Sequence, residues 1–460
     1  MGDLRTRLAE AARDGAQLFG PSSRLSLVEL ARASGLGEDR DSLAGRAVLA
    51  RTGTQIGAAQ ALVELDGLAR RIVIAPPDLA DEHLAQVVET AGIEAVVTDA
   101  ADEALDGLGL PVRVLAAPSL AVSAQDSGRL ASEWLMFTSG TTGAPKMVIH
   151  TLQGLTGAIR PRAAGASPIV WGTFYDIRRY GGLQILLRAL TAGSSMILSD
   201  AHEPVTRHLD RLGALGVTHL SGTPSHWRRL LMTGEARRIA PGYVRLSGEI
   251  ADQAVLDSLK AAFPAAAIGH AYASTEAGVG FEVDDGLEGF PEHFVGRAGG
   301  PVEMKVEDGS LRIRSPRAAL GYAGEAAPAL ADADGFVDTG DMVELKDGRW
   351  RFCGRRNGVI NVGGLKVHPE EVEAVINRHP AVRASLVRAR KSPITGALVA
   401  ADVALADPAA AEAPEAQAAL RASILAACRA ALPLHKAPAS VRFVPGLAVT
   451  AGGKLDRAHG

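Results

Sequence analysis

Cysteine and long apolar runs are both scarce in this sequence. Only two cysteines occur among 460 residues, Cys353 and Cys428, and neither belongs to a CxxC pair. This scarcity excludes a disulfide framework, argues against a zinc site and is typical of a reducing compartment, so we expect a cytoplasmic protein. No apolar run approaches the ~20 residues that a membrane-spanning helix needs, and the first residues lack the apolar centre of a secretory signal. We therefore expect no membrane partner.

An excess of charge of one sign is also missing. The 48 Lys and Arg are balanced by 52 Asp and Glu, which gives a formal net charge of -4. Without a basic surplus, nucleic acid is not an expected partner. Hydrophobic residues make up 47% and charged residues 22%, which is ordinary for a globular protein long enough for more than one domain.

Short apolar runs alternate with amphipathic segments through residues 45–280. Runs such as residues 47–53 and 133–137 are rich in aliphatic side chains, whereas residues 203–216 and 251–263 have the apolar spacing of helices. Strands that alternate with helices in this way predict an α/β fold, with mainly parallel sheets flanked by helices.

The pattern changes to hairpins in residues 302–354. Two runs of alternating polar and apolar residues are each interrupted by an Asp-Gly dipeptide, at 308–309 and 347–348. Asp-Gly favours the tight turn that joins two antiparallel strands. We therefore predict a small β-barrel-like part at the end of the first domain.

A domain boundary is predicted near residue 356. The stretch at 355–364 is polar and glycine-rich, as a linker or loop would be, and a helix with proline in its first turn follows at 369–379. The chain then divides into an N-terminal domain of residues 1–355 and a small α+β C-terminal domain of residues 356–460.

The sharpest local signal is the loop FTSGTTGAPK at residues 137–146. Its glycines let the backbone approach an anion closely, and backbone N–H groups and hydroxyls donate to phosphate oxygens. Lys146 adds a full positive charge in a chain where lysine is rare beside arginine. The loop predicts a phosphate site, with an ordinary surface turn as the alternative.

Several further motifs follow this loop in a recognisable order. With them the chain resembles the adenylate-forming (AMP-binding) superfamily, which contains acyl- and aryl-CoA synthetases, nonribosomal peptide synthetase adenylation domains and luciferases. The resemblance covers nearly the whole chain and is carried by residues 138–146 with His150, 271–276 (AYASTE), 338–341 (DTGD), 354–373, 434–438 (LHKAP) and 453–457 (GKLDR). One departure is Ala273, which stands where the family usually has glycine.

The resemblance implies ATP-dependent activation of a carboxylic acid as an acyl-adenylate, with release of pyrophosphate and transfer to a thiol. The implied cofactors are ATP and Mg²⁺, and the implied partners are a small carboxylic acid and either CoA or the phosphopantetheine of a carrier protein. Transfer to an amine or another nucleophile remains open. So does a nucleotide-binding module without ligase activity.

The resemblance also implies roles for individual residues. Lys454 bridges the reacting anions during adenylation, Lys146 lies on pyrophosphate, Thr275 contacts the α-phosphate and Glu276 holds Mg²⁺. The implied nucleotide-binding residues are Thr138, Ser139, Gly140, Thr141, Thr142, Gly143, Lys146, Gly248, Glu249, Ala271, Tyr272, Ala273, Ser274, Thr275, Asp341 and Arg355.

Each of these side chains has an ordinary structural alternative. Glu276 could be an acid at the start of a helix, and Tyr272, expected to stack on adenine, could be a core aromatic. Asp341, expected to accept the ribose hydroxyls, could be a turn residue, and Arg355 a solvated surface arginine.

The acid-binding pocket is expected to draw on three separate segments of the chain. Its expected lining consists of Phe174, Tyr175, Asp176, Arg179, Gly181, Trp227 and Gly248. Asp176 could bind an amino group of the substrate or pair with Arg178 or Arg179, and we favour the ion pair because adjacent opposite charges usually satisfy each other. Bulky aromatic side chains would shorten the pocket, which favours a compact aromatic or short functionalised acid.

Lys454 lies almost at the end of the chain and must be brought to the site. The resemblance implies that the C-terminal domain is mobile and turns on a hinge. Asn357 stands where the family usually has Asp or Lys at that hinge, which leaves the balance between the two domain orientations open.

Overall fold

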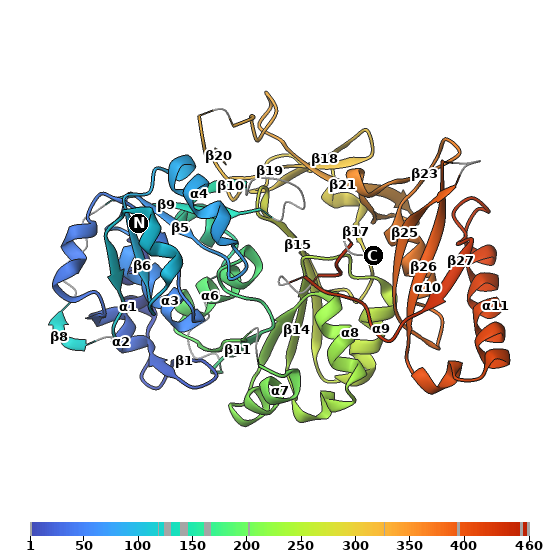
Figure 1. Ribbon diagram of the computed structural model, residues 1–460, viewed down its shortest axis with the longest axis horizontal. Coiled ribbons are helices and arrows are strands. Elements are labelled where there is room, and N and C mark those ends of the chain that lie inside the picture. Colours follow the sequence, from blue (N-terminus) through green and yellow to red (C-terminus); the bar gives the residue numbers. More distant parts are fainter. Residues whose placement is uncertain are drawn as a thin grey trace.

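The chain forms three sheet-rich regions that follow one another along the long axis (Figure 1). The computed structural model describes residues 2–117, 119–123, 130–138, 146–160, 167–200, 203–325, 327–392, 396–450 and 454–457. The N-terminus lies in the blue region at one end, and β25, β26, β27 and α11 lie at the other. The C-terminus turns back from there toward the middle of the molecule.

A seven-stranded sheet forms the first region, in the order β20-β10-β9-β5-β4-β6-β7. Its strands are β4 (Ala47–Ala50), β5 (Arg71–Ile74), β6 (Ala95–Thr98), β7 (Val112–Val114), β9 (Glu133–Phe137), β10 (Met147–Thr151) and β20 (Gly321–Tyr322). The pairs from β9 to β7 are parallel, and β10 and β20 add antiparallel strands at the edge. The predicted apolar runs therefore form buried parallel strands.

An eight-stranded sheet forms the second region, in the order β16-β15-β14-β13-β11-β12-β1-β2. Its strands are β1 (Gln17–Phe19), β2 (Arg24–Ser26), β11 (Val170–Thr173), β12 (Ser195–Ile197), β13 (His219–Gly222), β14 (Tyr243–Ser247), β15 (Ala267–Ser274) and β16 (Gly278–Val283). The inner pairs are parallel, and the two edge pairs are antiparallel. The strand pattern expected from residue 45 onward missed β1 and β2.

Helices fill the space around both sheets. They are α1 (Leu4–Ala11), α2 (Leu27–Arg32), α3 (Gln55–Leu65), α4 (Leu84–Ala91), α5 (Leu152–Thr156), α6 (Tyr180–Ala192), α7 (Val205–Ala214), α8 (Pro224–Met232) and α9 (Gln253–Ala262). Helix α3 is buried on nearly every side, because one apolar cluster joins it, α1 and α6 to strands of both sheets. Helices α7, α8 and α9 pack in a second cluster with the eight-stranded sheet. A short pair, β3 (Ala33–Ser34) and β8 (Ser119–Ser123), lies apart.

The small β part is a five-stranded antiparallel sheet in the order β17-β22-β21-β19-β18. Its strands are β17 (Phe290–Pro291), β18 (Glu303–Glu307), β19 (Ser310–Arg314), β21 (Val337–Lys346) and β22 (Arg349–Arg355). Both predicted hairpin turns are confirmed: φ is 51° and 74° in the first Asp-Gly pair and 52° and 72° in the second. Positive φ at both central residues is the geometry that Asp-Gly favours.

The C-terminal part has an apolar core of its own. It consists of β23 (Ile360–Val362), β24 (Leu365–Val367), α10 (Pro369–Ile376), β25 (Val382–Ser392), β26 (Gly396–Leu405), α11 (Pro414–Ala431) and β27 (Ser440–Phe443). Every residue of its core cluster lies between Ile360 and Phe443. Both cysteines are free, Cys353 half-buried and Cys428 buried. No helix in the described ranges has the length and apolar character to cross a bilayer.

Candidate active site

The predicted phosphate loop connects the antiparallel strands β9 and β10. Phe137 pairs with Met147, and the N–H of Thr138 donates to the carbonyl of Lys146 at 2.9 Å, so the two ends of the loop are held together. Lys146 is exposed at the start of β10. Ser139, Gly140, Thr141, Thr142 and Gly143 lie outside the described residues, and their phosphate contacts stay a prediction.

The next predicted motif forms the turn between β15 and β16. The strand register shifts between Tyr272 and Ala273, and Thr275 and Glu276 lie in the turn itself. Glu276 is therefore not a residue at the start of a helix. Ala271 is buried within β15, and the Ser274 hydroxyl accepts the N–H of Ala277 at 2.9 Å. Glu276 therefore lies, half-buried, where β15 and β16 meet.

His150 fixes this turn from the neighbouring sheet. Its side chain is fully buried, and its Nε2–H donates to the carbonyl of Thr275 at 2.7 Å. Burial lowers the pKa of His150 to about 4, so the ring is neutral near pH 7. Its role in the structure is to position Thr275, across 125 residues of sequence.

Glu276 is well suited to hold a cation. Its carboxylate is half-buried and has no hydrogen bond or ion pair within the part of the chain that the structure describes. Burial and, next, the negative charge of Glu276 raise the pKa of Tyr322. Magnesium is commonly bound by one or two carboxylates together with substrate phosphates and water. The described residues contain no group of three acidic, histidine or cysteine ligands, so this single carboxylate fits Mg²⁺ better than a metal held by protein alone.

Tyr272, Asp341 and Arg355 form one connected group. The Tyr272 hydroxyl donates to Asp341 Oδ2 at 2.6 Å, and Arg355 Nε lies 2.7 Å from Asp341 Oδ1. Asp341 and Arg355 face each other on β21 and β22. Burial raises the pKa of Asp341, and the nearby Arg355 charge opposes that rise. Asp341 is therefore more than a turn residue, and Arg355, although 59% exposed, is ion-paired rather than merely solvated.

The ring of Tyr272 belongs to an aromatic cluster. It stacks on Phe352 at 5.3 Å between ring centroids and on Phe281 at 5.6 Å. These contacts confirm the core-aromatic alternative for part of the ring surface. Stacking on adenine stays a prediction.

Lys454 reaches this group from the end of the chain. It lies on a short hairpin in which the N–H of Thr450 donates to the Lys454 carbonyl at 2.7 Å. Its Cε is 3.5 Å from the position that a Cβ on Gly248 would take, and Gly248 has a φ of +87°. A Cβ at residue 248 would make ordinary van der Waals contact with the lysine, and the positive φ is what favours glycine at this position. The Lys454 side chain therefore packs against the backbone directly after β14.

The charge around Lys454 is mixed. Burial lowers the pKa of Lys454, the Glu249 carboxylate raises it, Arg355 lowers it and Asp341 raises it. These groups come from segments far apart in the sequence. The structure thus places Lys454, Gly248, Glu249, Asp341 and Arg355 near one another, and their roles toward a nucleotide stay a prediction.

Aromatic side chains gather behind Gly248. Phe174 stacks on His226 at 5.6 Å and meets Trp227 edge-on at 5.7 Å. The Tyr175 hydroxyl donates to the carbonyl of Ser247 at 2.7 Å, and Gly181 lies against the Tyr175 ring. These contacts bring the predicted aromatic residues of the acid pocket together.

The sequence placed the acid pocket along residues 221–227 but did not single out His226. It lies three residues after Thr223, and the two side chains form a capping box at the start of α8. Burial lowers the pKa of His226 to about 4. The Thr-x-x-His spacing just after a strand was the available signal, although a capping box usually ends in Glu or Gln.

Asp176 and Arg179 have partners elsewhere. Asp176 binds Arg178 through both oxygens, at 2.7 and 2.9 Å, and the two side chains are only 9% and 7% exposed. Arg178 also donates to the carbonyl of Thr52. Arg179 pairs with Asp78. The ion-pair interpretation of Asp176 is confirmed, and its engaged oxygens make it a poor contact for a substrate.

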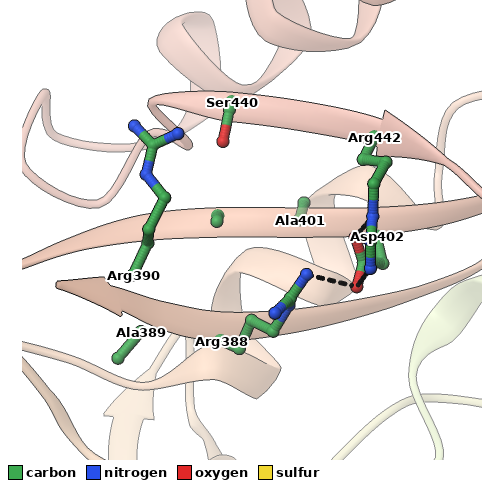
Figure 2. Close-up of a pocket in the computed structure, with 8 residues that line it drawn as sticks. Arg388, Ala389, Arg390, Ala401, Asp402, Ser440 and Arg442 are labelled. Carbon is green, nitrogen blue, oxygen red and sulfur yellow. Dashed lines mark hydrogen bonds and ion pairs between the residues drawn. The ribbon is translucent and has the colours of Figure 1, made fainter. Parts of the chain in front are cut away.

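A separate hollow of about 330 Å³ lies on the sheet of β25, β26 and β27, away from these residues (Figure 2). Three arginines line it, but Asp402 already binds Arg442 through both oxygens, at 2.7 and 2.8 Å, and pairs with Arg388 at 3.0 Å. Arg388 and Arg442 thus neutralise a buried carboxylate and tie the three strands together.

Comparison with known proteins places the chain in a family. The family model for the AMP-binding enzyme matches residues 68–323, and that for the AMP-binding enzyme C-terminal domain matches residues 371–454. A 2-succinylbenzoate–CoA ligase of Salmonella typhimurium is 28% identical over 355 residues, covering 75% of this chain and 73% of the ligase. An anthranilate–CoA ligase of Pseudomonas aeruginosa is 28% identical over 348 residues, covering 71% of this chain and 66% of the ligase.

A solved structure agrees over the whole length. A benzoate CoA ligase from Burkholderia xenovorans LB400 superposes with a TM-score of 0.81 at 19% identity, covering 100% of this chain and 99% of the ligase. At this identity the likeness shows the fold. It accounts for the large N-terminal part, with its two main sheets and smaller β part, and for the separate C-terminal part.

Proposed function

Because the chain belongs to the AMP-binding enzyme family, we propose that it activates a carboxylic acid with ATP and transfers the acyl group to a thiol. The observation that carries the proposal is the approach of Lys454 to Asp341 and Arg355 beside Gly248. A lysine near the end of a chain is ordinarily solvated. Here it is half-buried among charged groups that come from distant segments, which supports a catalytic role.

The chemistry joins two anions, because a carboxylate must attack the α-phosphate of ATP. A carboxylate oxygen forms a bond to the α-phosphorus, which gives the acyl-adenylate. The bond between that phosphorus and the bridging oxygen breaks, and pyrophosphate leaves. Positive charge and fixed orientation are what a site can contribute to such a step. Lys454 and Arg355 would supply charge at the reacting end, and Lys146 would supply it at the pyrophosphate end. Asp341, held by Tyr272 and Arg355, offers its carboxylate to the ribose hydroxyls.

Mg²⁺ would be held by Glu276 and by the phosphates of ATP. Bound there, it would supply further positive charge to the triphosphate. The chain's own part is to keep Glu276 in place, which the His150 bond to Thr275 and the β15–β16 turn do.

The acid is proposed to be compact and aromatic. Phe174, Tyr175, His226 and Trp227 fill the space behind Gly248, which supports a short substrate. The relatives named above act on 2-succinylbenzoate, anthranilate and benzoate, all aromatic acids, and are CoA ligases. We therefore propose CoA as the acceptor. The two free cysteines fit a reducing cytoplasm as its place of action.

A pyrophosphate-release assay over a panel of aromatic and short acids, with and without CoA, tests the proposal. We expect pyrophosphate with a compact aromatic acid and a thioester when CoA is added. If pyrophosphate is released and no thioester forms, but an added amine is converted to an amide, the acyl acceptor is an amine rather than a thiol. No release with any acid would overturn the adenylation itself.

Glu276→Gln should weaken the Mg²⁺ dependence of the first step. The amide keeps the size of the side chain but loses the charge that attracts a hard cation. We expect the Mg²⁺ concentration for half-maximal pyrophosphate release to rise by at least about tenfold, the loss typical when a metal contact is removed. The measurement is a Mg²⁺ titration of pyrophosphate release, with circular dichroism as the control for folding. An unchanged titration curve would remove Glu276 from the metal site.

A further inference from the structure

Glu249 makes contacts that a nucleotide-binding role does not explain. It follows Gly248, where the chain turns after β14, and its carboxylate reaches the beginning of α8. One oxygen, Oε2, accepts the N–H of Ser225 at 2.9 Å, and the other, Oε1, accepts the Ser225 hydroxyl at 3.0 Å. The carboxylate is thereby held against the positive end of a helix.

A third bond joins this carboxylate to the C-terminal part. Oε1 also accepts the N–H of Leu455 at 2.9 Å, across 206 residues of sequence. Leu455 directly follows Lys454 and pairs with Val449 in the hairpin that carries the lysine. We call this segment, residues 448–450 and 454–457, the lysine hairpin. Glu249 thus connects the N-terminal part to the residue next to the catalytic lysine.

The lysine hairpin is held from its other side by its own domain. Arg457 binds Glu373 on α10 at 2.9 and 2.8 Å and lies 3.3 Å from Glu370. Donor and acceptors of these bonds all belong to the C-terminal part, so the bonds persist when that part turns. The bond from Leu455 to Glu249 would break, because its acceptor belongs to the N-terminal part.

We propose that Glu249 is a positioning residue that latches the lysine hairpin in the orientation for adenylate formation. The latch rests on the proposed function. Its negative charge also raises the pKa of Lys454, so the same carboxylate favours the charged form of the lysine. Turning the C-terminal part for the second step breaks the Leu455 bond but leaves both Ser225 bonds in place, so the latch can close again.

The first test is hydrogen exchange at the lysine hairpin, measured by mass spectrometry in the full-length enzyme without substrates. Glu249→Ala should speed exchange at residues 454–457 by about tenfold, the range for losing a hydrogen bond to a charged group. Ser225→Ala is the matched control, because it removes only the hydroxyl bond and leaves Leu455 bound. Equal exchange in wild type and Glu249→Ala would overturn the latch. This readout needs no activity, so it stands even if the proposed function fails.

The second test compares the two half-reactions. Glu249→Ala should lower kcat for pyrophosphate release by about tenfold or more, leave KM for ATP within about twofold, and leave thioester formation from supplied acyl-adenylate near the wild-type rate. Glu249→Gln keeps one acceptor oxygen, so its kcat for pyrophosphate release should lie between those of the wild type and Glu249→Ala. Ser225→Ala should keep the wild-type ratio of the two half-reaction rates. A rise in KM for ATP without a fall in kcat would make Glu249 a nucleotide contact, and an equal loss in both half-reactions would make it merely structural. Either result overturns the proposal.

Discussion

Lys454→Ala should slow adenylate formation by at least about a hundredfold, the usual loss when a group that stabilises transition-state charge is removed. The lysine lies beside Gly248, near Asp341 and Arg355, where the carboxylate and the α-phosphate would meet. Alanine removes the charge without filling the space. Thioester formation from supplied acyl-adenylate should stay close to the wild-type rate, because the lysine hairpin leaves the site for that step in the proposed mechanism.

Measuring both half-reactions on one preparation checks this expectation. Lys346→Ala is the matched control, since Lys346 is an exposed lysine at the β21–β22 turn, and it should change neither rate by more than about twofold. Equal loss of both half-reactions in Lys454→Ala would count against two orientations of the C-terminal part. A normal rate of adenylation would remove Lys454 from the mechanism.

Asp176→Ala should destabilise the protein by about 3–5 kcal/mol, the cost of leaving a buried charge without its partner. Both oxygens of Asp176 bind Arg178, and the two side chains are 9% and 7% exposed. Without the carboxylate, the Arg178 guanidinium keeps only its bond to the Thr52 carbonyl. The measurement is the shift of the thermal unfolding midpoint.

Two further variants distinguish a structural role of the Asp176–Arg178 ion pair from a role in substrate selection. The double variant Asp176→Ala with Arg178→Met removes both charges and should recover most of the lost stability. Arg179→Ala breaks a more exposed pair with Asp78 and should cost less than about 1 kcal/mol. A stable Asp176→Ala enzyme with an altered preference among acids would show instead that Asp176 faces the substrate.

Local chemistry allowed most of the fold to be predicted. The Asp-Gly turns and the proline-led helix α10 follow from backbone geometry, and the aliphatic runs follow from burial on both faces of parallel sheets. Strands β1 and β2 were missed because each has three residues, too few for a pattern. Their place comes from distant pairing, such as Leu18 with Met196.

The sequence motifs named candidate residues for the site, but they did not predict which of these residues contact one another. The motifs named Tyr272, Asp341, Arg355 and Lys454, yet local spacing does not say that a phenol and a guanidinium share one carboxylate. Nor does it say that Glu249 bonds to the backbone of Leu455. Such contacts depend on how different segments of the chain meet in space, which local spacing does not determine.

The attachment of the chain end to α10 has a consequence for how quickly the lysine can act. A lysine on a free tail would reach its site at an effective concentration of about millimolar, set by the many conformations of the tail. Arg457 removes those conformations by fastening the lysine hairpin to Glu373 and Glu370. In the proposed mechanism, Lys454 then reaches its site through a single movement, the rotation of the C-terminal part. Its local concentration at the acid would depend on the equilibrium of that rotation.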